Sequence, residues 1–338
     1  MMMVKVIREL TEYNNIVVTL FPENHFGEEL ICDKYYCLNL SSLLLFPKAA
    51  LRLKKIILEN NVDLVHSHLF WPTIIARLGT PRKIPLITTI HAFIANSVEY
   101  KNLHIRILDK LTYRLRNNII IAVAKGAKEE YFECLRLKPR DSYALHTFVD
   151  VRLFNSNDSN LIVDSPGVFK IITVGALRIQ KNHKYLVEAL SLLKDENIEL
   201  DVYGSGPLRD TIQKQISDSS SKVCLKGEVK NIPHIIEQYD LFVMSSTYEG
   251  FSLGVLEAMA MKVPLLLSDI RSFREQCEDT ACYFDLSKVA DFADKIRMLI
   301  ADHKLRFQMA EQAKLRVLDN FTLDQHMKGL RAIYCESF

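Results

Sequence analysis

Two carboxylates eight positions apart are the residues of this chain best suited to chemistry. Glu249 lies in a loop after the apolar run 241–244, and Glu257 lies about one turn into a helix expected at 253–260. The first backbone N–H groups of a helix have no partner within it and bind a pyrophosphate well. Carboxylates beside such an anion site can accept hydrogen bonds from sugar and ribose hydroxyls. The plainer alternative is a helix whose early glutamate favours the helix dipole.

The segment Glu249–Glu257 resembles the Glu-x7-Glu signature of the retaining glycosyltransferases of family 4, which have the GT-B fold. Other segments resemble further motifs of that family. They are 173–182, 201–207 and 226–229 in the second half, and 65–68, 88–91 and 146–154 in the first half. Each match is weak alone, but together they follow the order and spacing of the family.

The resemblance implies catalytic roles for four residues. Breaking a glycosyl-phosphate bond builds negative charge on the leaving diphosphate, which fixed cations stabilise. Arg178 and Lys181 are the candidates, although the family usually has arginine where this chain has Ala176. Glu249 would bind hydroxyls of the transferred sugar. His91, at the end of an expected strand, would contact donor or acceptor near the reacting centre.

The resemblance also implies a set of nucleotide-sugar contacts. Val229 would contact the base through its main chain, and Glu257 would bind the ribose hydroxyls. The turn glycines would allow the backbone to approach the donor closely, with ordinary turn geometry as the alternative. The predicted binding residues are Gly175, Gly204, Gly206, Val229, Gly250, Phe251, Ser252, Leu253 and Glu257.

The predicted activity is hexosyl transfer from a UDP- or GDP-sugar to a glycan or lipid-linked acceptor with retention of configuration. We expect front-face attack, in which the departing phosphate takes the acceptor's proton, because we identify no carboxylate nucleophile in the first domain. The family needs no metal or cofactor and acts in cell-surface polysaccharide or glycolipid synthesis. Two alternatives stay open: a nucleotide-sugar 2-epimerase on the same fold, and a truncated homologue that binds nucleotide with little or no turnover.

Short apolar runs alternate with amphipathic segments along the whole chain. Strands that are apolar on both faces and alternate with helices favour parallel sheets covered on both sides. The pattern restarts after the polar stretch 155–167, which we interpret as a linker. The predicted fold class is α/β, with two doubly wound, Rossmann-like domains at 1–155 and 156–320 that face each other across a cleft. Residues 321–338 are expected to form a helix that packs on the first domain.

The beginning of the chain departs from this pattern. A doubly wound domain opens with a strand and a glycine-rich turn, but here a helix expected at Val4–Tyr13 leads into a strand at Ile16–Leu20. We therefore expect the central first strand of the N-terminal domain to be missing. Its absence would leave a strand edge in the middle of the sheet unpaired.

Composition limits the classes of partner and the cellular location that we expect. The chain has 338 residues, ordinary apolar content and a formal net charge of +2, which does not favour nucleic acid as a partner. Its seven cysteines form no Cys-x-x-Cys pair, so we expect a reducing, cytoplasmic location without disulfides or zinc. His66 and His68 should point the same way from one strand, but no third ligand at suitable spacing indicates a metal site.

A basic stripe suggests a further partner. Arg106, Lys110 and Arg114 lie four residues apart in a helix expected at Asn102–Arg116, whose apolar residues also recur every four positions. Such a stripe is attracted to anionic headgroups, so it predicts peripheral contact with the inner face of the membrane. A solvated helix face explains the same charges.

Overall fold

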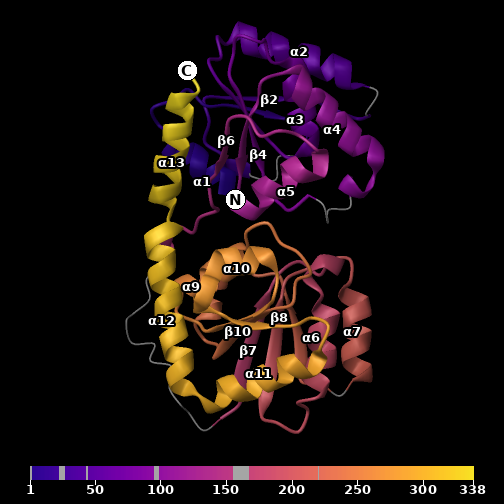
Figure 1. Ribbon diagram of the computed structural model, residues 1–338, viewed down its shortest axis with the longest axis vertical. Helices are drawn as coiled ribbons and strands as arrows, with labels where there is room; N and C mark the ends of the chain where they lie inside the picture. Colours follow the sequence, from indigo (N-terminus) through magenta and orange to yellow (C-terminus); the bar gives the residue numbers. More distant parts are fainter. Residues whose placement is uncertain (1, 23–26, 43–44, 95–98, 155–166, 220) are drawn as a thin grey trace. The chain divides into compact units, whose positions relative to one another are not determined.

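The computed structural model of the protein describes residues 2–22, 27–42, 45–94, 99–154, 167–219 and 221–338 (Figure 1). The chain divides into two compact units, one made of Met1–Leu145 with Met327–Phe338 and the other of His146–His326. The first boundary between these compact units lies at 145/146, and the domain boundary at 155/156 stays a prediction. Residues after 145 bond to the second unit: His146 Nε2 lies 3.1 Å from Glu275 Oε1, and Val149 forms a parallel bridge with Thr322.

The linker predicted at 155–167 lies, except for its last residue, outside the described residues. The second boundary between the units falls inside the last helix, α13 (Leu323–Glu336). The end of α13 is held in the first unit. Arg331 donates to Glu12 Oε1 over 2.5 Å, and the Tyr334 ring meets Tyr13 edge-on at 5.8 Å between centroids.

The first unit is built from alternating helices and parallel strands. Its described elements are α1 (Met2–Glu9), β1 (Ile16–Thr19), β2 (Lys34–Cys37), α2 (Phe46–Glu59), β3 (Val65–His68), α3 (Phe70–Gly79), β4 (Leu86–Ile90), α4 (Leu103–Leu115), β5 (Ile119–Ala122), α5 (Lys125–Leu135), β6 (Ser142–Ala144) and the end of α13.

The strands of the first unit form two sheets. One has the order β3-β4-β5-β6 and the other is the pair β1-β2, with every pairing parallel. Val18 of β1 and Val65 of β3 nevertheless pack on the same hydrophobic core, which includes Leu53 and Ile57 of α2. Among the described strands, β1 pairs only with β2, and β3 only with β4. The absence of a first strand that would pair with these two strand edges stays a prediction.

A buried polar cluster links three helices of this unit. Arg77 of α3 contacts Asp109 of α4 at 2.5 Å, and both side chains are almost fully buried. The Tyr131 hydroxyl of α5 donates to Asp109 Oδ1 over 3.0 Å and accepts from Arg77 Nη2 over 3.1 Å. Because a buried charge is costly without a partner, this cluster fixes the rotation of α4 against α3.

The second unit contains one six-stranded parallel sheet with the order β12-β11-β10-β7-β8-β9. Its described elements are β7 (Phe169–Val174), α6 (His183–Ser191), β8 (Ile198–Tyr203), α7 (Arg209–Asp218), β9 (Val223–Gly227), α8 (Ile232–Ile236), β10 (Leu241–Met244), α9 (Leu253–Ala260), β11 (Leu265–Ser268), α10 (Arg271–Cys277), β12 (Cys282–Phe284), α11 (Val289–Ala301), α12 (His303–Asn320) and the start of α13.

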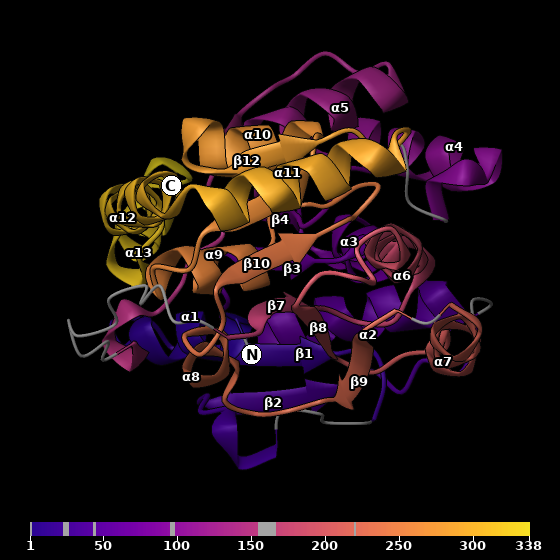
Figure 2. The same cartoon turned by 90° about the horizontal axis from the view of Figure 1, so that it is seen from below.

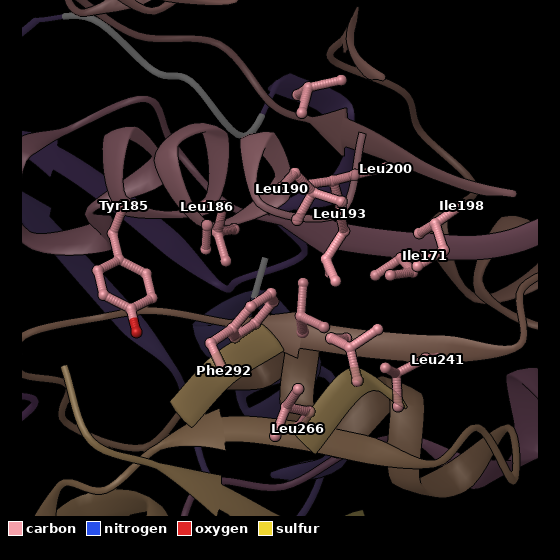
Figure 3. Close-up of a cluster of buried hydrophobic side chains, with 14 of the residues drawn as sticks. Ile171, Tyr185, Leu186, Leu190, Leu193, Ile198, Leu200, Leu241, Leu266 and Phe292 are labelled. Atoms are coloured by element: carbon pink, nitrogen blue, oxygen red, sulfur yellow. The ribbon is translucent and has the colours of Figure 1, made fainter. Parts of the chain in front are cut away.

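Helices cover both faces of this sheet. α6 contacts α7 and α11 on one face, and α9 contacts α8 and α12 on the other (Figure 2). Figure 3 shows the core between the sheet and the face covered by α6, α7 and α11. There Leu186 and Leu190 of α6 meet Ile171, Leu200 and other strand residues. All four residues of β10 are buried, as expected for a central strand covered on both sides.

Most expected elements are present, with shifts of a few residues at their ends. The strand expected at Val62–Val65 lies at Val65–His68 instead, and the first helix ends at Glu9 and not at Tyr13. The short strands β2, β6 and β12 were not predicted. None of the described helices has the length and apolarity required to cross a bilayer.

Candidate functional site

Three loops of the second unit meet at one edge of its sheet. They follow the neighbouring parallel strands β10, β7 and β8, so they leave the sheet at the same end. The loop after β10 is tied to the loop after β7, because the Thr247 N–H donates to the Gln180 carbonyl over 2.8 Å. This edge holds most of the predicted site residues.

Lys181 and Glu249 form an ion pair between two of these loops. Lys181 Nζ lies 2.7 Å from Glu249 Oε1, and the two side chains are 16% and 9% exposed. The Ser246 hydroxyl donates to the same carboxylate oxygen over 2.6 Å. The cation is thereby fixed beside a carboxylate, although the two residues are 68 positions apart in the sequence. Sequence reasoning did not single out Ser246.

The three turn glycines lie where a side chain would meet neighbouring loop atoms. A Cβ atom on Gly175 would lie 3.2 Å from Lys181 Cε, so this glycine makes room for the lysine chain. Gly204 has φ +142°, and a Cβ there would overlap the Gly175 carbonyl oxygen. A Cβ on Gly206 would lie 2.6 Å from the Leu177 carbonyl oxygen. Packing against neighbouring backbone thus requires glycine at 204 and 206, and Gly175 leaves room for Lys181, while close approach of all three to the donor stays a prediction.

The start of α9 differs from the expectation at one position. The Ser252 N–H donates to Gln276 Oε1 over 3.0 Å, and Gln276 Nε2 donates back to the Ser252 carbonyl over 2.8 Å. The prediction that the Ser252 N–H is an unpaired helix-start donor is therefore wrong. The next amides, those of Leu253 and Gly254, make no hydrogen bond found in the described part of the chain. Sequence reasoning missed Gln276, because this residue lies in none of the family's motifs.

The other predicted binding residues take varied positions. The Phe251 ring is buried against His146 and Phe321, with centroid distances of 5.0 and 5.1 Å, so its side chain serves packing. Gly250 is buried beside it, whereas Glu257 is half-buried in the second turn of α9. Val229 is half-buried in the loop after β9.

Arg178 and His183 flank Lys181 in different environments. The Arg178 side chain is exposed at the start of a short 3-10 helix, Ile179–Lys181, and no ion pair to it is found among the described residues. His183, the first residue of α6, is 3% exposed, and burial together with nearby Lys181 lowers its pKa to about 4. A neutral imidazole thus lies beside the cation, a feature that sequence reasoning missed.

His91 belongs to the first unit, where it joins a histidine cluster. His68 Nδ1 lies 3.0 Å from His91 Nε2, and the His66 and His68 rings are 4.3 Å apart between centroids. His66 Nδ1 lies 2.8 Å from the Tyr334 hydroxyl of α13. The described residues contain no group of three or more histidine, cysteine or carboxylate side chains that could hold a metal ion.

Comparison with known proteins assigns the family. Residues 162–316 match the family model described as glycosyl transferases group 1, and residues 6–153 match that of glycosyltransferase family 4. The chain belongs to the family 4 glycosyltransferases. Lys181 and Glu249 both lie within the residues that match the group 1 model. The chain is therefore an enzyme that transfers sugar from a nucleotide-sugar.

Curated glycosyltransferases resemble the chain along most of its length. N-acetyl-alpha-D-glucosaminyl L-malate synthase of Bacillus anthracis is 23% identical over 84% of this chain and 77% of its own. UDP-Gal:alpha-D-GlcNAc-diphosphoundecaprenol alpha-1,3-galactosyltransferase of Escherichia coli is 22% identical over 94% of this chain and 91% of its own.

Solved structures show the same fold. Anabaena HepE in complex with UDP and glucose superposes with a TM-score of 0.84 at 13% identity, covering 98% of this chain and 94% of that one. A glycosyltransferase from Rickettsia africae superposes with a TM-score of 0.81 at 18% identity, covering 99% and 93%. The predicted GT-B fold of the family 4 glycosyltransferases is thereby confirmed.

Proposed function

We propose that this glycosyltransferase moves a hexosyl residue from a UDP-sugar to a glycan or lipid-linked acceptor with retention of configuration. The observation that carries the proposal is the Lys181–Glu249 pair, 2.7 Å apart, at the loop edge of the second unit's sheet. UDP is favoured over GDP because the similarly folded Anabaena HepE is described in complex with UDP-glucose.

The pair supplies complementary chemistry. The sugar's C1–O bond to the diphosphate breaks as a bond from C1 to the acceptor oxygen forms, and the acceptor's proton passes to the departing phosphate. Lys181 and the exposed Arg178 would stabilise the charge on that phosphate, and Glu249 would accept hydrogen bonds from sugar hydroxyls. His91 is proposed to contact donor or acceptor from the first unit. The side-chain cations make a resident metal or cofactor unnecessary in this proposal.

The acceptor class is inferred from relatives. The Escherichia coli relative is named for a diphosphoundecaprenol acceptor, and so is a Campylobacter jejuni N-acetylgalactosaminyltransferase that is 24% identical over 86% of this chain. A lipid-linked acceptor fits a cytoplasmic enzyme that works at the inner face of the membrane in cell-surface polysaccharide or glycolipid synthesis.

The test offers the purified protein a set of UDP- and GDP-sugars with and without water-soluble lipid-linked-sugar analogues, and measures nucleotide release. We expect UDP release that requires an acceptor, an axial product linkage by NMR when the donor is α-linked, and no effect of EDTA. Release of UDP without acceptor, together with a 2-epimerised free sugar, would instead show an epimerase. No release with any pair would favour an inactive homologue.

A further inference from the structure

Helix α4 of the first unit exposes the side that its sequence pattern would be expected to bury. Its apolar residues, spaced four apart, form a ridge that faces solvent. The exposed fractions are 67% for Leu103, 48% for Ile107, 54% for Leu111 and 60% for Leu115. Large apolar side chains aligned over three helical turns are a candidate interaction surface.

The opposite side of α4 is buried and partly polar, which prevents the ridge from turning inward. Asp109, Thr112 and Tyr113 lie on that side. Arg77 donates to Asp109 Oδ1 and, over 3.1 Å, to the Thr112 hydroxyl. Rotating the helix to bury its leucines would separate this buried carboxylate from its cation. The exposed ridge is therefore a fixed feature of the folded unit.

Basic residues border the ridge on one side. At about 100° per residue, Lys110 and Arg114 lie about 20° to either side of Leu103 around the helix axis, and Arg106 lies about 60° from it. Arg114 is exposed, whereas Arg106 and Lys110 are half-buried, and Arg106 Nε donates to the Tyr100 carbonyl over 2.5 Å. Across the described residues no ion pair joins Lys110 or Arg114 to a carboxylate.

We propose that α4 is an interfacial helix that docks the enzyme on an anionic lipid surface. The leucine ridge would enter the boundary between headgroups and acyl chains, and Lys110 and Arg114 would lie against anionic headgroups. An exposed apolar face beside cations is the composition of helices that bind in the plane of a membrane. The basic stripe predicted from sequence thus gains an apolar partner that sequence analysis did not assign to this surface.

A second copy of the chain is a poorer occupant of this ridge. In a two-fold symmetric dimer the same patch lies on both subunits, so the cations beside one ridge would approach those beside the other. The only acidic residue of α4, Asp109, is buried and already bonded to Arg77. A lipid surface with negative charge satisfies both the apolar and the cationic part of the patch.

The docking proposal extends the proposed function by placing the enzyme where a lipid-linked acceptor lies, but it does not depend on the donor or on catalysis. Sedimentation with phosphatidylcholine vesicles, with and without phosphatidylglycerol, tests it. Two variants address the two parts of the patch: Ile107→Gln with Leu111→Gln, and Lys110→Glu with Arg114→Glu. The matched control is Leu315→Gln with Leu318→Gln, which changes two exposed leucines of α12.

We expect the parent and the control to bind vesicles containing phosphatidylglycerol, and each α4 variant to lose at least about tenfold in partition coefficient. A Leu111→Trp variant should show fluorescence quenching by brominated lipid beyond that of the parent's Trp71. Parent-like binding by the glutamine variant, or absence of binding by the parent, would overturn the proposal. So would a parent dimer that this variant dissociates, since the ridge would then be a protein interface.

Turnover of a water-soluble acceptor analogue separates this proposal from the preceding one. All α4 variants should keep parent turnover with that substrate, because their changed side chains are exposed or at the surface of the first unit. Loss of vesicle binding with unchanged turnover supports docking alone. A parent that binds vesicles but transfers no sugar would count against the proposed function and leave docking standing.

Discussion

At the scale of single residues, the site rests on one lysine whose position depends on several neighbours. Its amine is held by Glu249, and its aliphatic chain lies against Gly175. The motif order predicted that Lys181 and Glu249 belong to one site. It did not predict that Gly175 positions the lysine, since a spacing of six residues says nothing about contact across a turn.

Replacing either partner of the ion pair should impair transfer. We expect Lys181→Ala and Glu249→Ala each to lower kcat by at least about 100-fold, the scale for losing one preorganised electrostatic contact. Lys184→Ala, at an exposed lysine of α6, is the control and should keep parent turnover. Steady-state kinetics on variants with parent circular dichroism spectra measure this. Near-normal turnover of Lys181→Ala would contradict the proposed contact between Lys181 and the phosphate.

Two glycine substitutions should separate positioning from strain. In Gly175→Ala the new Cβ meets a movable lysine chain, so we expect kcat to fall about tenfold with little change in Tm. In Gly204→Ala the residue must keep φ +142° and displace the Gly175 carbonyl, so we expect a loss of about 1–3 kcal/mol or more in unfolding free energy. Thermal and denaturant unfolding with kinetics distinguish the two. Equal loss of stability in both would contradict this assignment.

At the scale of elements, α4 shows where periodicity stops being informative. The four-residue repeat of leucine and isoleucine correctly predicted a helix over 102–116, but a repeat does not say which side meets water. Burial of the other side depends on Arg77, which comes from α3 and bonds to Asp109. That contact joins residues 32 positions apart, so no local pattern reveals it.

The start of α6 should make stability depend on pH. His183 has a folded pKa of about 4 against a reference of 6.5. Between these values the unfolded state binds the proton and the native state does not, so stability is lost as pH falls. We expect His183 to contribute about 2 kcal/mol of the stability lost between pH 7.5 and pH 5.

The variant His183→Leu isolates this contribution. Urea unfolding of parent and variant at both pH values should give a smaller pH-dependent loss in the variant, by about 2 kcal/mol. At pH 7.5 the variant should be about as stable as the parent, because His183 Nδ1 has no hydrogen-bond partner among the described residues. An equal pH dependence in parent and variant would show that His183 is not the titrating group.

At the scale of the whole molecule, alternation of apolar runs and helices predicted two α/β units with parallel sheets. The short strands β2, β6 and β12 were missed because their sequences, KYYC, SYA and CYF, contain no valine, leucine or isoleucine and so lack the aliphatic runs that indicated most of the other strands. Polar composition marks 155–167 as a linker, whereas the compact second unit already begins at His146, because His146 and Val149 bond to residues of that unit. Such tertiary contacts are not encoded in composition.

Nucleotide binding should be visible as protection confined to loops of the second unit. We expect saturating UDP to slow amide exchange in 175–182, 204–207, 226–229 and 246–254, because these segments follow neighbouring parallel strands or include the Lys181–Glu249 pair. A ligand that binds only the native state at 100 times its Kd adds about 2.7 kcal/mol to stability, so Tm should rise as well. GDP at the same concentration should protect less, and Lys181→Ala should weaken the UDP effect.

Helix α4 serves as an internal control, since its exchange should not change without lipid. Protection by UDP outside these loops only, or a larger effect of GDP, would refute the donor assignment while leaving the fold and the family unaffected.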